Sequence, residues 1–274
     1  MVLTVTVLQA IILGLVQGLT EFLPVSSSGH LVLAPELLGI PSPPLAFDVL
    51  LHLATALAVA GYFAREIRLM LYSFLAPARL QREDVKDFRR LVLWLVIGSI
   101  PAGVAGVMFG DFFESLFDST LAVGVFLLAT SALLVAAEFV VRSGSARRKV
   151  RDMGLVDALI VGCFQALAIA PGLSRSGSTI AGGIFLGLDR ASAARFSFLL
   201  AIPAIGGAGL LKISGMIDGI GTAAPAYLAG AAAALISGAL TVHLLLRFLR
   251  TRGLWVFAAY TAILGVLVVF LSLL

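Results

Sequence analysis

Hydrophobic residues occur along this chain in long runs, which short polar or charged segments separate. Six runs are long enough to cross a bilayer, which takes roughly 20 helical residues. They cover residues 45–63, 91–110, 120–141, 190–211, 223–246 and 254–274. This pattern predicts an all-α integral membrane protein with six transmembrane helices.

Two further apolar stretches, residues 1–40 and 154–188, are interrupted by polar residues. The first contains VSSSGH at 25–30, and the second contains PGLSRSGST at 171–179. Irregular backbone at membrane depth is tolerated only where it is buried in protein or lines a cavity. We therefore expect each stretch to form a re-entrant helical hairpin with the polar segment at its tip. In the first stretch, a full span over residues 3–24 is the alternative.

The composition excludes a soluble protein. Hydrophobic residues make up 60% of the 274 residues and charged residues only 12%, whereas soluble domains are about half apolar and a quarter charged. The N-terminal sequence MVLTVTVLQA has neither a basic region nor a cleavage site, so we expect no signal peptide. A single cysteine excludes an internal disulfide.

The positions of the basic residues predict the topology. Most of the 19 Lys and Arg residues lie in segments 65–90, 142–151 and 247–252 or at Arg190 and Arg195. Loop 111–119 has none, and loop 212–222 has only Lys212. By the positive-inside rule, the basic segments are cytoplasmic and the other two loops external. We expect a multi-pass protein of the cell membrane with external N- and C-termini. The net charge of +4 then reflects topology, and no nucleic-acid partner is expected.

The second hairpin repeats the first. With an offset of 148 residues, five residues of the first hairpin align with identical ones in the second: Gly14, Gln17, Ser26, Ser28 and Gly29 with Gly162, Gln165, Ser174, Ser176 and Gly177. Each half, 1–148 and 149–274, then has one hairpin and three spans, so the halves have opposite orientations. We expect a single membrane domain, residues 1–274, with two inverted-topology repeats whose tips meet in mid-membrane.

Both tips contain residue types that bind phosphate. Serines at helix starts act as N-caps, and the free N–H groups and dipole of a helix N-terminus suit an anion. Glycine lets the backbone approach a ligand closely, and Arg175 offers a planar fork that matches phosphate oxygens. The candidate phosphate-binding residues are Ser26, Ser28, Gly29, Ser174, Ser176, Gly177 and Thr179.

Glu21 and His30 are candidates for the chemistry itself. A charge at membrane depth is costly unless it is paired or functional. A carboxylate beside a phosphate suggests a divalent cation between them, or a role as base or orienter. His30 can exchange a proton near neutral pH. We interpret His52 as structural, and we expect Glu138 to pair with Arg142 four residues later.

The segments QGLTEFLPVSSSGH and PGLSRSGSTIAGG closely resemble the two signature motifs of the bacitracin-resistance type undecaprenyl pyrophosphate phosphatase family. FDVLLHLATALAV and RFSFLLAIP also resemble that family, so the similarity covers nearly the whole chain. The resemblance implies a phosphoanhydride hydrolase that converts a polyprenyl (undecaprenyl) diphosphate lipid to the monophosphate. This reaction recycles the lipid carrier for peptidoglycan synthesis and confers bacitracin resistance. The resemblance also implies a divalent metal, Mg²⁺ or Ca²⁺, and an active site that opens externally.

The resemblance also assigns roles to residues. It makes Glu21 and Gln17 metal ligands, although the amide of Gln17 carries no charge. It places Ser27, His30, Glu21 and Arg175 in the catalytic set. We expect Ser27 to be the nucleophile and His30 its base, because residues three apart at a helix start can share a face. Direct attack by His30, and attack by water with His30 as base, are the alternatives.

Other functions share some of these sequence features. A transporter or flippase for a phosphorylated lipid or anion would share the inverted repeats and use the tips only for binding. The lipid phosphatase superfamily has similar SGH and SR elements. However, its K-x6-RP motif is missing here, and Ala181 stands where its histidine would be. A scaffold would not need Arg175 at membrane depth. The sequence does not determine the length of the prenyl chain, the identity of the metal or the oligomeric state, for which a homodimer is one alternative.

Overall fold

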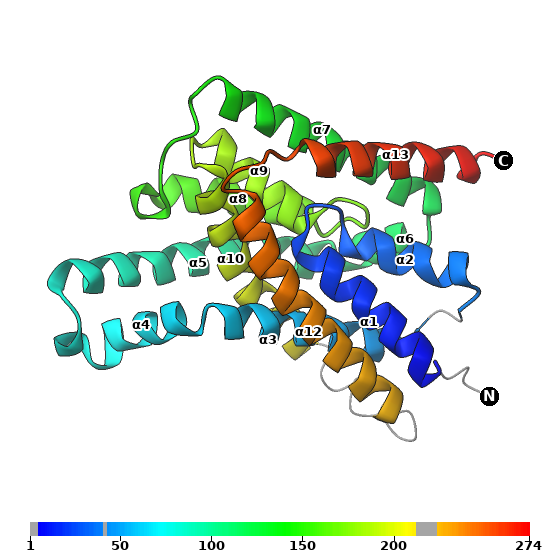
Figure 1. Ribbon diagram of the computed structural model, residues 1–274, viewed down its shortest axis with the longest axis horizontal. Helices are drawn as coiled ribbons and strands as arrows, with labels where there is room; N and C mark the ends of the chain where they lie inside the picture. The colour runs from blue at the N-terminus through cyan, green and yellow to red at the C-terminus, as the bar shows by residue number, and fades with distance from the viewer. Residues whose placement is uncertain (1–4, 41–42, 212–223) are drawn as a thin grey trace.

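The computed structural model describes residues 5–40, 43–211 and 224–274, and its regular structure in these ranges is helical (Figure 1). Six described helices are long and apolar enough to cross a membrane. They are α3 (Leu45–Tyr62), α5 (Arg82–Met108), α7 (Thr120–Arg142), α10 (Arg190–Leu211), α12 (Ala224–Phe248) and α13 (Trp255–Ser272). The predicted all-α fold and its six long apolar helices are confirmed. Helix α5 begins about one-third of its length earlier than predicted, inside the basic segment.

Each stretch with a polar tip folds into two short helices joined by a turn. The first consists of α1 (Val7–Phe22) and α2 (Ser27–Leu38), and the second of α8 (Leu155–Leu167) and α9 (Arg175–Phe185). Helix α1 has 16 residues, fewer than the roughly 20 that a span takes, and it ends before the polar tip. Figure 1 shows both hairpins lying among the long helices.

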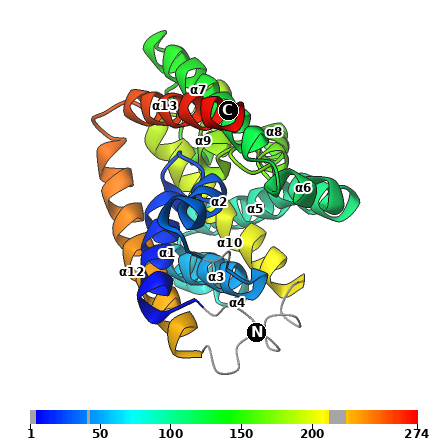
Figure 2. The same cartoon turned by 90° about the vertical axis from the view of Figure 1, so that its right-hand side faces the viewer.

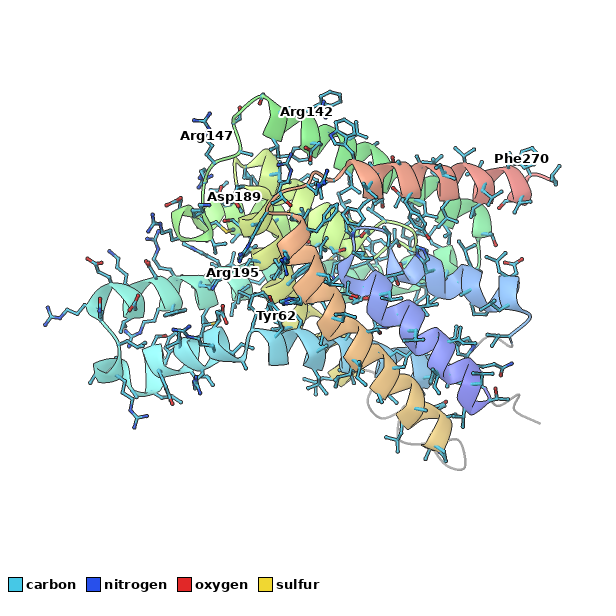
Figure 3. The ribbon with its side chains drawn as sticks, in the orientation of Figure 1. Tyr62, Arg142, Arg147, Asp189, Arg195 and Phe270 are labelled. Atoms are coloured by element: carbon cyan, nitrogen blue, oxygen red, sulfur yellow. The ribbon has the colours of Figure 1, made fainter. Side chains whose placement is uncertain are left out.

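The remaining helices connect these elements. Helix α4 (Ala64–Leu75) and the 3₁₀ turn η1 (Pro77–Arg79) lead into α5, α6 (Gly110–Phe117) joins α5 to α7, and η2 (Val150–Asp152) precedes α8. Figure 3 shows Arg147 and Arg195 in the part of the molecule opposite Phe270, so basic side chains are segregated from the C-terminal end of α13. The loop 212–222, expected to be external, lies outside the described residues.

Small residues allow α1 to lie directly against α12, as Figures 1 and 2 show. A Cβ atom on Gly14 would clash with the carbonyl oxygen of Gly230, and one on Gly18 would clash with Ser237. Such close approach is the common way in which membrane helices pack, since lipid gives no hydrophobic drive for their association. The contact fixes the position of α1, and Glu21 lies at the C-terminal end of this helix.

Ion pairs tie the loop between α7 and α8 to α8 itself and to the residue that precedes α10. Arg148 Nη2 lies 2.6 Å from Asp157 Oδ2, and Lys149 Nζ lies 2.5 Å from Asp189 Oδ2. The hydrogen bond that Arg148 donates to Asp157 raises the pKa of Arg148 above its usual value. The first pair ties the loop to a helix of the second hairpin and the second ties it to the segment that follows α9, so both help to position that hairpin.

The expected pairing of Glu138 with Arg142 is wrong. Glu138 pairs with Arg190 at the start of α10, and it also accepts a hydrogen bond of 3.0 Å from the Leu254 backbone N–H. The Arg142 guanidinium instead lies over the Trp255 ring, 4.8 Å from its centroid. The Glu138 side chain is buried, with an exposed fraction of 2%. A buried carboxylate needs several donors, and here other segments supply them.

Candidate active site at the two hairpin tips

The tips of the two hairpins are in contact. The Ser176 hydroxyl donates a hydrogen bond of 2.9 Å to the Leu23 carbonyl oxygen of the first tip. A Cβ atom on Gly29 would lie 3.3 Å from the Cα of Gly172, so the two backbones approach closely where glycine allows it. The predicted meeting of the tips is therefore confirmed, whereas their depth in a membrane stays a prediction.

A helix begins at each tip with a serine cap, as predicted. Ser26 Oγ accepts a hydrogen bond of 3.2 Å from the Gly29 N–H at the start of α2, and Ser174 Oγ accepts one of 3.0 Å from the Gly177 N–H at the start of α9. Ser26 has a φ of +70°, which is unusual for a residue with a side chain. Such strained residues are concentrated at functional sites. Two helix N-termini, with their positive dipole ends, thus start where the hairpins meet.

The carboxylate of Glu21 is the centre of the site. Its Oε1 accepts a hydrogen bond of 2.8 Å from Arg175 Nη2, and its Oε2 accepts bonds from the Ser27 hydroxyl at 2.6 Å and from Gln17 Nε2 at 2.9 Å. His52 Nε2 of α3 lies 3.7 Å from Oε2. The Glu21 residue is only 5% exposed. The structure thus brings the predicted Gln17, Glu21, Ser27 and Arg175 together around one buried charge.

His30 is held by partners that the sequence did not suggest. Its Nδ1 lies 2.7 Å from the Ser26 carbonyl oxygen, which only accepts, so Nδ1 carries a proton. Its Nε2 lies 2.7 Å from Tyr260 Oη of α13. The Ser27 hydroxyl donates to Glu21 and not to His30, which differs from the expected serine–histidine pair. The reason is that the Ser26 carbonyl and Tyr260 occupy both ring nitrogens.

Hydrogen bonds tie the second tip to the neighbouring helices α7 and α10. The Ser174 N–H donates to Thr130 Oγ1 at 2.9 Å, which ties the tip to α7. The Thr179 hydroxyl donates to the Arg175 carbonyl oxygen at 2.7 Å and lies 2.6 Å from Ser197 Oγ of α10. These bonds position the backbone that carries the Arg175 guanidinium. The roles of the predicted phosphate-binding hydroxyls, including those of Ser28 and Ser176, stay predictions.

Four residues that contact the site were missed or judged structural. They are His52, Thr130, Ser197 and Tyr260. Each lies on a long apolar helix, where one or two polar residues are common in ordinary helix packing. For His52 one signal existed, since it lies in FDVLLHLATALAV, a segment that carries part of the family resemblance.

Gln17 and Glu21 can provide part of a cation site. Gln17 is fully buried, and its Oε1 has no hydrogen-bond partner among the described residues. The described residues contain no group of three or more His, Cys, Asp and Glu side chains that could hold a metal. Mg²⁺ typically binds one or two carboxylates together with substrate phosphates and water. One carboxylate and one free amide oxygen therefore fit a cation that the substrate helps to hold, and not a preformed protein cage.

Comparison with known proteins shows the family to which the chain belongs. The family model described as "Bacitracin resistance protein BacA" matches residues 10–267, which include both tips. An undecaprenyl-diphosphatase of Methanosphaera stadtmanae is 44% identical over 275 residues, which cover 97% of this chain and 98% of the relative. Those of Alkaliphilus metalliredigens and Gemmatimonas aurantiaca are 41% and 44% identical, over 98% and 96% of this chain and 100% and 97% of the relatives.

Proposed function

Since the chain belongs to the bacitracin resistance protein BacA family, we propose that it is an undecaprenyl-diphosphatase, which converts undecaprenyl diphosphate to the monophosphate and inorganic phosphate. This activity recycles the lipid carrier of cell-wall synthesis and confers bacitracin resistance. One structural observation carries the proposal. The contact between the tips brings a hydroxyl, a carboxylate and a guanidinium together, at Ser27, Glu21 and Arg175.

Arg175 and the two helix N-termini are the proposed phosphate-binding groups. A guanidinium has five N–H donors, and Arg175 uses Nη2 for Glu21 and Nη1 for the Ser197 carbonyl oxygen at 3.5 Å. Its remaining donors can hold phosphate oxygens while the bond to Glu21 persists. The positive ends of α2 and α9 add to this attraction. Together they offset the charge of a diphosphate in a region with little water.

Ser27 is the proposed nucleophile. Its Oγ attacks the terminal phosphorus, the bond from phosphorus to the bridging oxygen breaks, and the prenyl monophosphate leaves. Glu21, which already accepts the Ser27 hydrogen bond at 2.6 Å, takes the proton. Water then hydrolyses the phosphoserine and releases inorganic phosphate. His30 is the nucleophile or the base in the two competing schemes.

We also propose that Glu21 and Gln17 hold a divalent cation, Mg²⁺ or Ca²⁺, jointly with the substrate. The free Oε1 of the buried Gln17 supports this. Such a cation would offset charge on the phosphoryl oxygens. Arg175 offsets the same charge, so activity should depend on both.

The finer topology is proposed as well. The two hairpins are re-entrant, and the segments 1–148 and 149–274 are inverted repeats. The site opens on the external side of the cell membrane, where both termini lie. The segregation of basic residues supports this orientation, since Figure 3 shows Arg147 and Arg195 away from Phe270.

Rapid quench with a substrate labelled in the terminal phosphate tests the chemistry. A phosphoserine survives acid and is lost in alkali, whereas phosphohistidine behaves oppositely. Ser27→Ala should abolish the adduct and most phosphate release. Ser99→Ala should change neither, because the Ser99 hydroxyl bonds to the Leu95 carbonyl oxygen of its own helix. If no adduct forms and Ser27→Ala keeps substantial turnover, Ser27 is not the nucleophile. If the purified chain releases no phosphate but moves lipid between leaflets, the transporter alternative holds.

A further inference from the structure

An apolar groove lies beside the second tip. Its volume is about 640 Å³, and it is bounded by α6, α7, α8 and the turn that precedes α9. Every residue that lines it is apolar, including Phe112, Phe113 and Leu116 of α6 and Phe126 of α7. Short helix α6 thus turns three large side chains toward the groove. A hydrocarbon could enter without leaving any polar group unpaired.

The turn before α9 and the middle of α7 contribute residues both to the groove and to the second tip. Leu173 lines the groove and directly precedes Ser174, the N-cap of α9. Ala129 also lines it and directly precedes Thr130, whose Oγ1 accepts the Ser174 N–H. On its other side, the same turn faces the first tip through Gly172. The groove therefore reaches the turn that carries Ser174, the cap of one of the two helix N-termini proposed to hold the diphosphate.

We infer that this groove binds the first isoprene units of the substrate's prenyl chain, an inference that rests on the proposed function. The chain is covalently attached to the diphosphate, so it must leave the site over an apolar surface that is continuous with it. The volume falls within the range of about 300–1,000 Å³ typical of small-molecule sites. A chain tethered at its phosphate end enters at a high effective concentration, which favours it over free lipid chains of the bilayer.

Filling the groove from α7 tests the inference. Ala129 is half-buried and Ala132 is exposed, so each can be changed to Phe without disturbing a packed core. Ala136→Phe is the matched control, because Ala136 is exposed one helical turn beyond Ala132 and does not line the groove. The measured quantity is the ratio of kcat/KM for undecaprenyl diphosphate to kcat/KM for geranyl diphosphate, in one detergent.

We expect the unmodified chain to prefer the longer substrate. Ala129→Phe and Ala132→Phe should each lower the ratio about tenfold, the equivalent of about 1.4 kcal/mol, while Ala136→Phe keeps it. An unchanged ratio in both groove variants, or an equal fall in the control, would overturn the inference and leave the phosphatase activity intact. Absence of phosphate release from either substrate by the unmodified chain would overturn the proposed function, and the groove assignment with it.

Discussion

Replacing Glu21 by Gln is the most direct test of the site. The change keeps the size of the side chain but removes its charge, and it turns one carboxylate oxygen into an NH₂ donor. Glu21 accepts hydrogen bonds from Arg175, Ser27 and Gln17. At least one of these donors would then face another donor. The Arg175 side chain, only 16% exposed, would also lose its charged partner.

These contacts set the expected losses of stability and of turnover in Glu21→Gln. Breaking a buried ion pair by removing one partner lowers the free energy of unfolding by about 3–5 kcal/mol. If Glu21 takes the proton of Ser27, loss of this base also lowers kcat, by a factor of about 10²–10⁴. Glu138→Gln is a matched control, because Glu138 is also a buried carboxylate paired with an arginine, Arg190, but lies away from the tips.

The assay is phosphate release from undecaprenyl diphosphate by purified variants, with thermal unfolding followed in the same detergent. Both variants should unfold at lower temperature than the unmodified chain, and only Glu21→Gln should lose turnover while it is still folded. Turnover by Glu21→Gln within about threefold of the unmodified chain, far from the 10²–10⁴ expected for a lost base, would refute the role of Glu21. So would an equal loss in Glu138→Gln, since the effect would then be general destabilisation.

Three further predictions concern other residues of the two hairpins. Arg175→Lys should lose most turnover although the charge is kept, because an ammonium cannot hold two phosphate oxygens as the planar fork does; near-normal kcat would remove it from the site. In a titration with Mg²⁺ or Ca²⁺, Gln17→Glu should keep metal stimulation and Glu21→Gln should lose it, because only Glu21 offers an anionic oxygen there. Unchanged metal dependence in Glu21→Gln would place the cation elsewhere. Cysteines at Ser28 and Ser176, in a chain without its natural cysteine, should cross-link with a short reagent; failure to do so would contradict the contact between the tips.

Much of the fold could be predicted because its signals are local. The length of an apolar run determines whether a helix can cross a bilayer, and all six predicted spans have a matching helix. The capping roles of Ser26 and Ser174 also follow from short-range chemistry, since each bonds a backbone N–H three residues later. The repeat between the two polar segments correctly indicated that the two tips meet.

The sequence alone therefore determined that this is a helical membrane protein, and it predicted that the serine-rich tips carry the chemistry. Only the tertiary structure decided the hydrogen-bond partners of the site residues. Ser27 bonds to Glu21, and His30 to Tyr260, 230 residues away. Residue spacing describes which side chains share one helix face, but a buried carboxylate or imidazole takes its partners from whichever helices pack against it. In a membrane, where little water competes, that choice is set by close helix packing and is not visible in any short segment.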